Sequence, residues 1–130
     1  MIYLDTSVAL AQLLAEDRRP PAALWAETLV TSRLLAYELW NRIHTRKLTK
    51  THAEATQELL ARLAFLELEQ EVLQRALEPF PLPVRTLDAL HLASVDFLRR
   101  HGQRVALATY DERLAAAAKA LRFPLFDLLQ

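Results

Sequence analysis

The sequence predicts an α/β fold, in which a short and mostly parallel sheet lies between two layers of helices. Three apolar segments of strand length, 2–4, 29–31 and 105–108, are each followed by a segment with helical periodicity. Parallel strands read as nearly continuous apolar runs, because helices cover both faces of their sheet. Strands that alternate with helices in this way are typical of βαβ units. We therefore expect a three-layer α/β/α arrangement.

The remaining elements follow one another without a linker, so residues 1–130 are expected to form one domain. Prolines and the single glycine, Gly102, mark the element boundaries. In the first half we expect helices over 7–16, from Pro20–Pro21 to about 28, after the N-cap Ser32, and after a cap at Thr49 or Thr51. In the second half we expect a strand over 66–68, helices over 71–77, 87–100 (capped by Thr86, ended by Gly102) and 112–121, and an edge strand over 124–126.

The composition excludes several classes of protein. No cysteine is present, which rules out thiolate zinc sites and thiol nucleophiles and suits a reducing cytoplasm, the location we expect. No apolar run approaches the ~18 residues of a membrane span, and no basic segment precedes the apolar start as in a secretory signal. With 52% hydrophobic residues, the chain has ample material for a core. We expect a protein without membrane contacts.

Four acidic residues occupy comparable places in the expected fold. Asp5 and Asp111 come after the apolar segments 2–4 and 105–108. Asp88 lies in the first turn of its helix, and Glu38 lies in the first half of the helix after 29–31. Ligands of parallel α/β sheets bind outside the carboxyl ends of the strands, where these helices also begin. The four carboxylates are therefore expected to converge on one rim.

Each acid also has a purely structural interpretation. Asp5 alone fits a helix cap, Asp88 and Asp111 favour the helix N-termini near which they lie, and Glu38 forms an ordinary surface pair with Arg42. Taken together, however, clustered carboxylates repel one another unless a cation neutralises them. Hard divalent ions with oxygen ligands, Mg²⁺ or Mn²⁺, suit such a cluster. Paired ions of this kind cleave phosphodiesters without a histidine or serine nucleophile.

Four sequence blocks resemble the PIN-domain family, and in particular the VapC-type toxin ribonucleases. The blocks are Tyr3-Leu4-Asp5-Thr6-Ser7, Ala36-Tyr37-Glu38, Leu87-Asp88-Ala89-Leu90-His91-Leu92-Ala93 and Ala108-Thr109-Tyr110-Asp111-Glu112-Arg113-Leu114. Their order and spacing match the family over essentially the whole chain. The resemblance implies an Mg²⁺- or Mn²⁺-dependent endoribonuclease, a homodimer, and inhibition by a cognate antitoxin. It further implies that Asp5, Glu38, Asp88 and Asp111 are the catalytic, metal-binding acids, with Thr6, Ser7 and Thr109 as supporting hydroxyls.

The charge distribution leaves the RNA-binding surface open. The chain has sixteen basic and sixteen acidic residues, but they are segregated. Five bases and one acid lie between residues 33 and 50, whereas six acids and two bases lie between residues 54 and 78. A carboxylate rim repels RNA, so flanking cations are physically required. We assign phosphate contacts to Arg42, Arg46 and Lys47; solvated helix faces are the alternative.

Two other functions remain open at this stage. One is a non-catalytic, metal-binding PIN-like interaction module. The other is an aspartyl phosphotransfer domain, since Asp5 stands at a strand end, although Ser7 replaces the second aspartate of the haloacid-dehalogenase pattern. His91 is expected to be packed or hydrogen-bonded rather than a ligand, because its neighbours are apolar. Asp96 is expected to be structural, because it lies about 80° around the helix from Asp88.

Overall fold

A computed structural model describes residues 1–14 and 17–129 and contains a four-stranded parallel sheet. Its strands are β1 (Ile2–Leu4), β2 (Leu29–Ser32), β3 (Ala64–Leu66) and β4 (Ala106–Ala108), in the order β3-β2-β1-β4. The central strand β1 pairs Ile2 with Leu29 on one side and with Ala106 on the other. All strand pairings are parallel, which confirms the expected α/β class.

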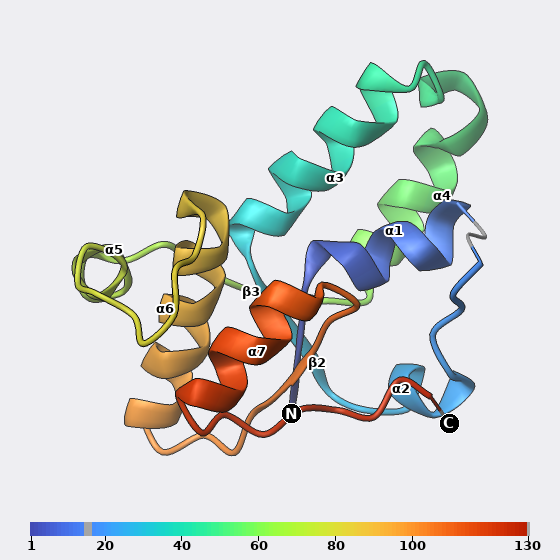
Figure 1. The fold of residues 1–130 in the computed structure, drawn as a ribbon. Helices are drawn as coiled ribbons and strands as arrows, with labels where there is room; N and C mark the ends of the chain where they lie inside the picture. The colour runs from blue at the N-terminus through green and yellow to red at the C-terminus, as the bar shows by residue number, and fades with distance from the viewer. Residues whose placement is uncertain (15–16, 130) are drawn as a thin grey trace.

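Helices cover both faces of this sheet (Figure 1). One layer contains α1, α3 and α4, with the short α2 beside them; the other contains α6 and α7, with α5 against α6. The bounds are α1 (Thr6–Leu14), α2 (Ala22–Trp25), α3 (Arg33–Thr45), α4 (Thr49–Ala61), α5 (Gln70–Ala76), α6 (Thr86–Arg100) and α7 (Glu112–Ala120). None of these helices is long and apolar enough to cross a membrane.

Alternation along the central strand divides the apolar residues into two cores. Ile2 and Leu4 face the layer of α1 and α3, where they pack with Val8, Leu35 and Leu39. Tyr3 faces the opposite layer, whose core is formed by α6 and α7 with β4. Every one of these side chains is buried. Because each face is covered by apolar helix stripes, the strand register is fixed and the carboxyl ends of the strands meet at one edge.

Helix capping follows the sequence prediction in part. The side chain of Ser32 caps α3 by accepting a hydrogen bond from the backbone of Leu34, as expected. The predicted threonine caps of α4 and α6 are wrong, because Leu48 and Arg85 occupy the cap positions and neither forms a side-chain cap. Gly102 adopts a φ of 84° just after α6, the left-handed conformation expected of a helix-ending glycine.

Other boundaries shift by a few residues. The strand expected at 66–68 is β3 at 64–66, and the helix expected from Pro20–Pro21 is only the four-residue α2. α1 ends at Leu14, and the last two residues of the helix expected over 7–16 lie outside the described residues.

The chain after α7 covers one edge of the sheet without forming the expected edge strand. Leu125 makes a single parallel bridge with Leu107 of β4. Leu107 donates its N–H to the carbonyl of Pro124 at 2.9 Å, and its own carbonyl accepts from Phe126 at 2.9 Å. The free side of β4 is therefore occupied by the chain's own C-terminal segment. No comparable segment pairs with the outer side of β3 among the described residues.

Candidate active site

The four acids singled out from the sequence line one cleft of about 870 Å³ at the carboxyl edge of the sheet. Asp5 directly follows β1, and Asp111 caps α7 shortly after β4. Glu38 lies in α3, and Asp88 lies in the first turn of α6. Parallel pairing brings the ends of β1 and β4 together, and α3 and α6 begin on the same side. Four distant segments of the chain thus meet in one hollow.

Asp5 is the most firmly held of the four carboxylates. It is 6% exposed, and its Oδ2 accepts hydrogen bonds from the hydroxyls of Ser7 at 2.6 Å and Thr109 at 2.8 Å. Ser7 Oγ in turn accepts from the backbone N–H of Tyr110, and Thr109 Oγ1 accepts from that of Asp111. These two hydroxyls join the start of α1 to the turn after β4. They fix the orientation of the Asp5 carboxylate.

Glu38 is held by a chain of polar groups that crosses the molecule. Its Oε1 accepts from Thr6 Oγ1 at 2.9 Å and lies 2.6 Å from Nε2 of His91. The other ring nitrogen, Nδ1, lies 2.8 Å from the hydroxyl of Tyr3, which also accepts the backbone N–H of Ser32 at 3.2 Å. A carboxylate only accepts hydrogen bonds, so Nε2 donates to Glu38 in either protonation state of the ring.

The ring of His91 is 1% exposed, and its Nε2 also lies 3.9 Å from Oδ1 of Asp5. Burial, the largest effect, lowers the pKa of His91 by disfavouring the charged ring. Interaction with Tyr3, the hydrogen bond to Glu38 and the charges of Asp5 and Glu38 outweigh burial and raise this pKa to about 10. His91 therefore binds Glu38 as a hydrogen-bond donor at the floor of the cleft. The prediction that it is packed and hydrogen-bonded is confirmed, but its partner is a candidate metal ligand.

The other two acids differ from each other in their environment. Asp111 uses Oδ1 to accept the backbone N–H groups of Arg113 at 2.9 Å and Leu114 at 3.2 Å, so it caps α7. Asp88 accepts no hydrogen bond within the part of the chain that the structure describes. Burial raises the pKa of Asp88, the negative charges of Asp111, Asp5 and Glu38 raise it further, and His91 lowers it. Asp88 is thus near enough to the other three carboxylates for their charges to act on it.

The donor set fits a hard divalent cation, because it consists of carboxylate and hydroxyl oxygens around a hollow. Within residues 1–14 and 17–129, no three acidic or histidine side chains converge closely enough to hold one ion between them. Asp5, Glu38 and Asp111 each use one carboxylate oxygen in a hydrogen bond to the protein, whereas Asp88 uses none among the described residues.

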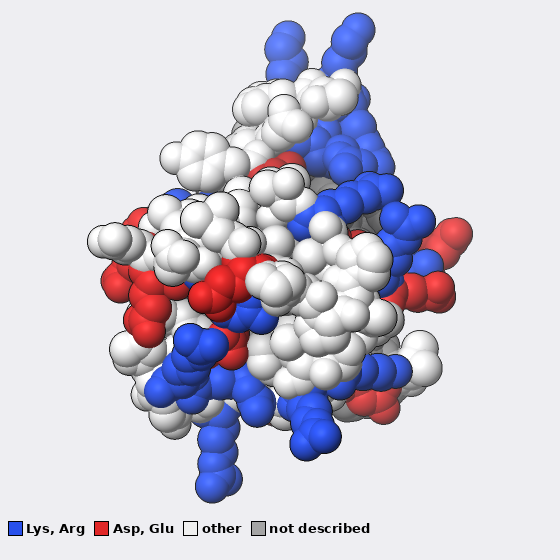
Figure 2. Space-filling model, turned by 60° about the vertical axis from the view of Figure 1, so that its left-hand side comes forward, with Lys and Arg blue, Asp and Glu red and all other residues white. Residues whose placement is uncertain are grey.

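Arginines surround the acids. Arg42 lines the cleft as anticipated, while Arg46 lines the adjoining hollow. Lys47 lines neither; it follows α3 with a φ of 59°. Figure 2 shows basic side chains gathered at the end of the molecule where α3 leads into α4. Three further arginines lining the cleft, Arg18, Arg85 and Arg113, were missed, because they come from three separate segments that only the fold brings together.

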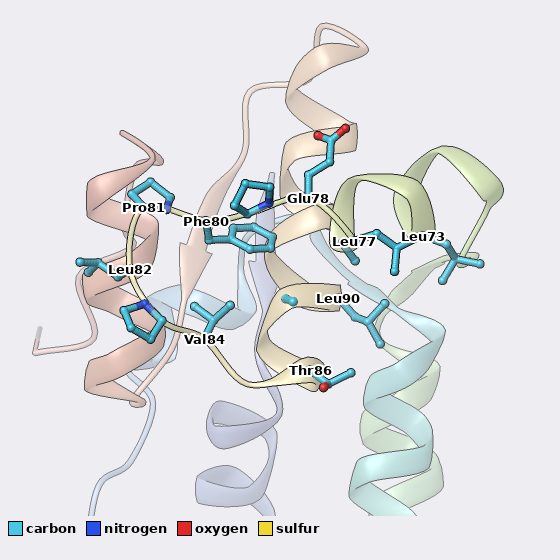
Figure 3. Close-up of a pocket in the computed structure, with 13 residues that line it drawn as sticks. Leu73, Leu77, Glu78, Phe80, Pro81, Leu82, Val84, Thr86 and Leu90 are labelled. Carbon is cyan, nitrogen blue, oxygen red and sulfur yellow. The ribbon is translucent and has the colours of Figure 1, made fainter.

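A second groove, of about 830 Å³, lies between α5, the loop at 78–85 and the start of α6. Figure 3 shows its walls, in which Leu77, Phe80, Val84 and Leu90 carry apolar side chains. Glu78 is the only ionisable side chain in its lining. The described lining of this groove offers no set of oxygen ligands, unlike that of the acid-lined cleft.

Asp96 lies outside the acid-lined cleft, as expected. Its carboxylate pairs with Arg100 at 3.0 Å and Arg75 at 3.4 Å and joins α6 to α5. It is therefore a structural acid on the same helix as Asp88.

Comparisons with known proteins agree with this architecture. Residues 2–120 match the family model described as the PIN domain. Ribonuclease VapC35 of Mycobacterium tuberculosis is 34% identical over 93% of this chain and 92% of its own length. Ribonuclease VapC47 of the same species is 32% identical over 95% of this chain and 93% of its own length. Two solved structures share the fold. A toxin–antitoxin complex from Klebsiella pneumoniae is 18% identical, with a TM-score of 0.68 over 92% of this chain and 94% of that one. The sarcin–ricin loop cleaving toxin VapC20 of M. tuberculosis is 21% identical, with a TM-score of 0.69 over 90% of this chain and 95% of that one.

The three-layer fold, the acids at its carboxyl edge and the match over residues 2–120 define one class of protein: the chain belongs to the PIN-domain family. Within that family, its relatives place it among the VapC-type proteins.

Proposed function

We propose that this protein is a divalent-metal-dependent endoribonuclease, the toxin of a toxin–antitoxin pair. One observation carries the proposal: Asp5, Glu38, Asp88 and Asp111, from four distant segments, line a single cleft, and the charges of the other three raise the pKa of Asp88. Carboxylates gathered in this way favour the binding of a cation. The names of the curated relatives, ribonuclease VapC35 and VapC47, support RNA as the substrate.

The proposed roles follow from the contacts. Asp88 and Asp111 present carboxylates to Mg²⁺ or Mn²⁺ from the helix starts, and Asp5 and Glu38 present theirs from the floor. Bound divalent cations supply an acidified water and stabilise the charge on the cleaved phosphodiester. The hydroxyls of Thr6, Ser7 and Thr109 orient the carboxylates, as their hydrogen bonds indicate.

Three further features belong to the proposal. Arg42 and Arg46 bind phosphates of the RNA, since both line the connected hollows. The toxin–antitoxin complex among the structural neighbours supports a cognate antitoxin as partner. A homodimer and a cytoplasmic location complete the assignment and follow from the resemblance to VapC-type toxins.

The decisive experiment compares Asp88→Asn with Asp96→Asn. Both acids lie on α6, but Asp88 lines the cleft whereas Asp96 pairs with Arg75 and Arg100. Purified protein, freed of any bound partner, is incubated with single-stranded RNA in Mg²⁺ or Mn²⁺ and, in parallel, in EDTA. We expect wild type and Asp96→Asn to cut RNA only with metal, and Asp88→Asn to cut none.

Two outcomes would overturn the assignment. Cleavage that persists in EDTA would remove the metal from the mechanism. An absence of cleavage by the metal-loaded wild type on all RNAs offered would favour a non-catalytic interaction module.

A further inference from the structure

The acid-lined cleft opens into a second hollow of about 560 Å³, which we call the arginine compartment. The two hollows share six lining residues, so they form one continuous depression: Ser7, Leu10, Arg18, Arg42, Tyr110 and Asp111. The compartment lies between α1, the C-terminal end of α3 and the turn after β4. A chain that crosses the acids in this direction therefore enters the compartment next.

Arg18 is fixed in place at the junction of the two hollows. Its Nη1 donates to the backbone carbonyl of Tyr110 at 2.9 Å, and its guanidinium carbon lies 5.5 Å from the centroid of the Tyr110 ring. Stacking and this hydrogen bond restrict a side chain that is otherwise exposed. The remaining N–H groups of the guanidinium are left for a ligand. A restrained arginine loses less entropy on binding than a mobile one.

Arg42 contributes a guanidinium that no acid neutralises. It is exposed, and it forms no ion pair within the described part of the chain. Arginines elsewhere do pair, as Arg33 does with Glu67 and Arg100 with Asp96. The described lining of the compartment also includes Arg46, Asp17 and Asp111. Arg42 therefore offers a positive charge directly beside the acid cluster.

We infer that the arginine compartment binds the phosphodiester next to the one that is cut. This inference rests on the proposed function and adds the path of the RNA through the site. Guanidinium groups match phosphate oxygens with paired hydrogen bonds, and contacts of this kind position a strand without reading its bases. The ligand is therefore the backbone of single-stranded RNA, held by Arg18 and Arg42 beside the acids.

The test measures binding separately from cleavage. Asp88→Asn serves as the non-cleaving parent, and a fluorescently labelled single-stranded RNA is titrated by anisotropy at several salt concentrations. Arg18→Ala and Arg42→Ala are compared with Arg104→Ala, an exposed arginine just before β4 and hence at the amino edge of the sheet. Each lost phosphate contact on single-stranded nucleic acid lowers the slope of log affinity against log salt by about 0.7.

We expect Arg18→Ala and Arg42→Ala to weaken binding several-fold and to reduce the salt slope, whereas Arg104→Ala changes neither. Arg18→Lys should retain the salt slope, because the charge remains. Its RNA affinity should fall, because lysine lacks the planar guanidinium that stacks on Tyr110 and forms paired hydrogen bonds with phosphate. If the two alanine variants bind like Arg104→Ala, the subsite is overturned even though the parent binds RNA. If wild type neither binds nor cuts any RNA, the proposed function fails, and this inference fails with it.

Discussion

A single buried histidine joins the sheet to the acid-bearing helix α3. Tyr3 on β1 and Glu38 on α3 bind the two ring nitrogens of His91, which itself lies on α6. One side chain therefore sets the spacing of three elements at the floor of the cleft. Because Nε2 donates to Oε1 of Glu38, it also restricts the orientation of a carboxylate that lines the cleft. Groups that orient a ligand in this way affect metal affinity without touching the ion.

His91→Phe should lower the affinity for Mn²⁺ by about 10- to 100-fold, because Glu38 loses the donor that orients it. Stability should also fall by about 1–3 kcal/mol for each polar group left without a partner. Tyr3→Phe is the matched control, since it keeps the bond from His91 to Glu38. It should lose stability but little Mn²⁺ affinity. Calorimetric Mn²⁺ titration and urea unfolding in EDTA measure the two effects, and equal Mn²⁺ affinities in wild type and His91→Phe would refute the positioning role.

The sequence predicted the positions and contacts of individual residues unevenly. The positions of Asp5 and Asp111 could be predicted because each follows an apolar run, and the local pattern of apolar residues shows where a strand ends. The partner of His91 was not readable, since Glu38 is 53 residues away and meets it only through packing. Arg18, Arg85 and Arg113 were missed for the same reason, because a charge on a loop or helix start carries no periodic signal. Lys47 was nominated from its place in a basic run, but it lies outside both hollows.

Helix α7 begins at a residue that also lines the candidate site. Asp111 is its N-cap and also a lining residue of the acid cleft. Apolar residues Leu114, Ala117 and Ala118 recur at helical spacing and bury one face against β4 and α6. A capping carboxylate also interacts favourably with the helix dipole. The two interpretations of Asp111 from the sequence, a charge that favours a helix N-terminus and a metal ligand, are therefore compatible.

Two substitutions separate these roles. Asp111→Ala should destabilise the protein by about 1 kcal/mol, because the backbone N–H groups of Arg113 and Leu114 lose their acceptor. Asp111→Asn should keep that stability, because asparagine caps helices as well as aspartate does. Both variants should lose Mn²⁺ affinity relative to wild type. Urea unfolding in EDTA together with Mn²⁺ titration gives the comparison, and an Asp111→Asn variant with unaltered Mn²⁺ affinity would limit Asp111 to capping.

At the scale of elements, most boundaries followed from pattern, and the errors have physical causes. Apolar periodicity located α3, α6 and α7 because each buries one stripe. Threonine was expected to cap α4 and α6, but Thr49 and Thr86 are the first residues of those helices, and Leu48 and Arg85 occupy the cap positions without a side-chain cap. The strand β3 was displaced by two residues because its burial is only partial and its alternation weak.

At the scale of the whole molecule, the cleft concentrates negative charge around Asp88. Burial and the charges of Asp111, Asp5 and Glu38 raise the pKa of Asp88, while His91 lowers it. The cleft lining contains five carboxylates and four arginines, a formal balance of one negative charge. A single divalent ion would make that balance positive. Metal binding and attraction of a polyanion are thus expected to reinforce each other.

Mg²⁺ or Mn²⁺ should therefore raise the thermal unfolding temperature of the wild type. The gain is about 2.7 kcal/mol at an ion concentration one hundred times the Kd. In EDTA, Asp88→Asn should unfold at a higher temperature than wild type, because the repelled charge is gone, and added metal should raise it less. Asp96→Asn should respond to metal as wild type does. Scanning calorimetry with and without ion measures these shifts, and a wild type indifferent to both ions would contradict the expectation.

The two edge strands of the sheet differ, because β4 is covered by a further segment of the chain whereas β3 is not covered by the described residues. Residues 124–126 occupy the open hydrogen-bonding side of β4, and a proline stands among them. An exposed edge strand can form backbone hydrogen bonds with a strand of another chain, and proline disfavours such pairing. Residues 124–126 thus cover β4 against edge-to-edge pairing with another sheet on that flank. Their removal would uncover β4 next to the turn that carries Thr109 and Asp111, so one short segment shields both the strand and the border of the candidate site.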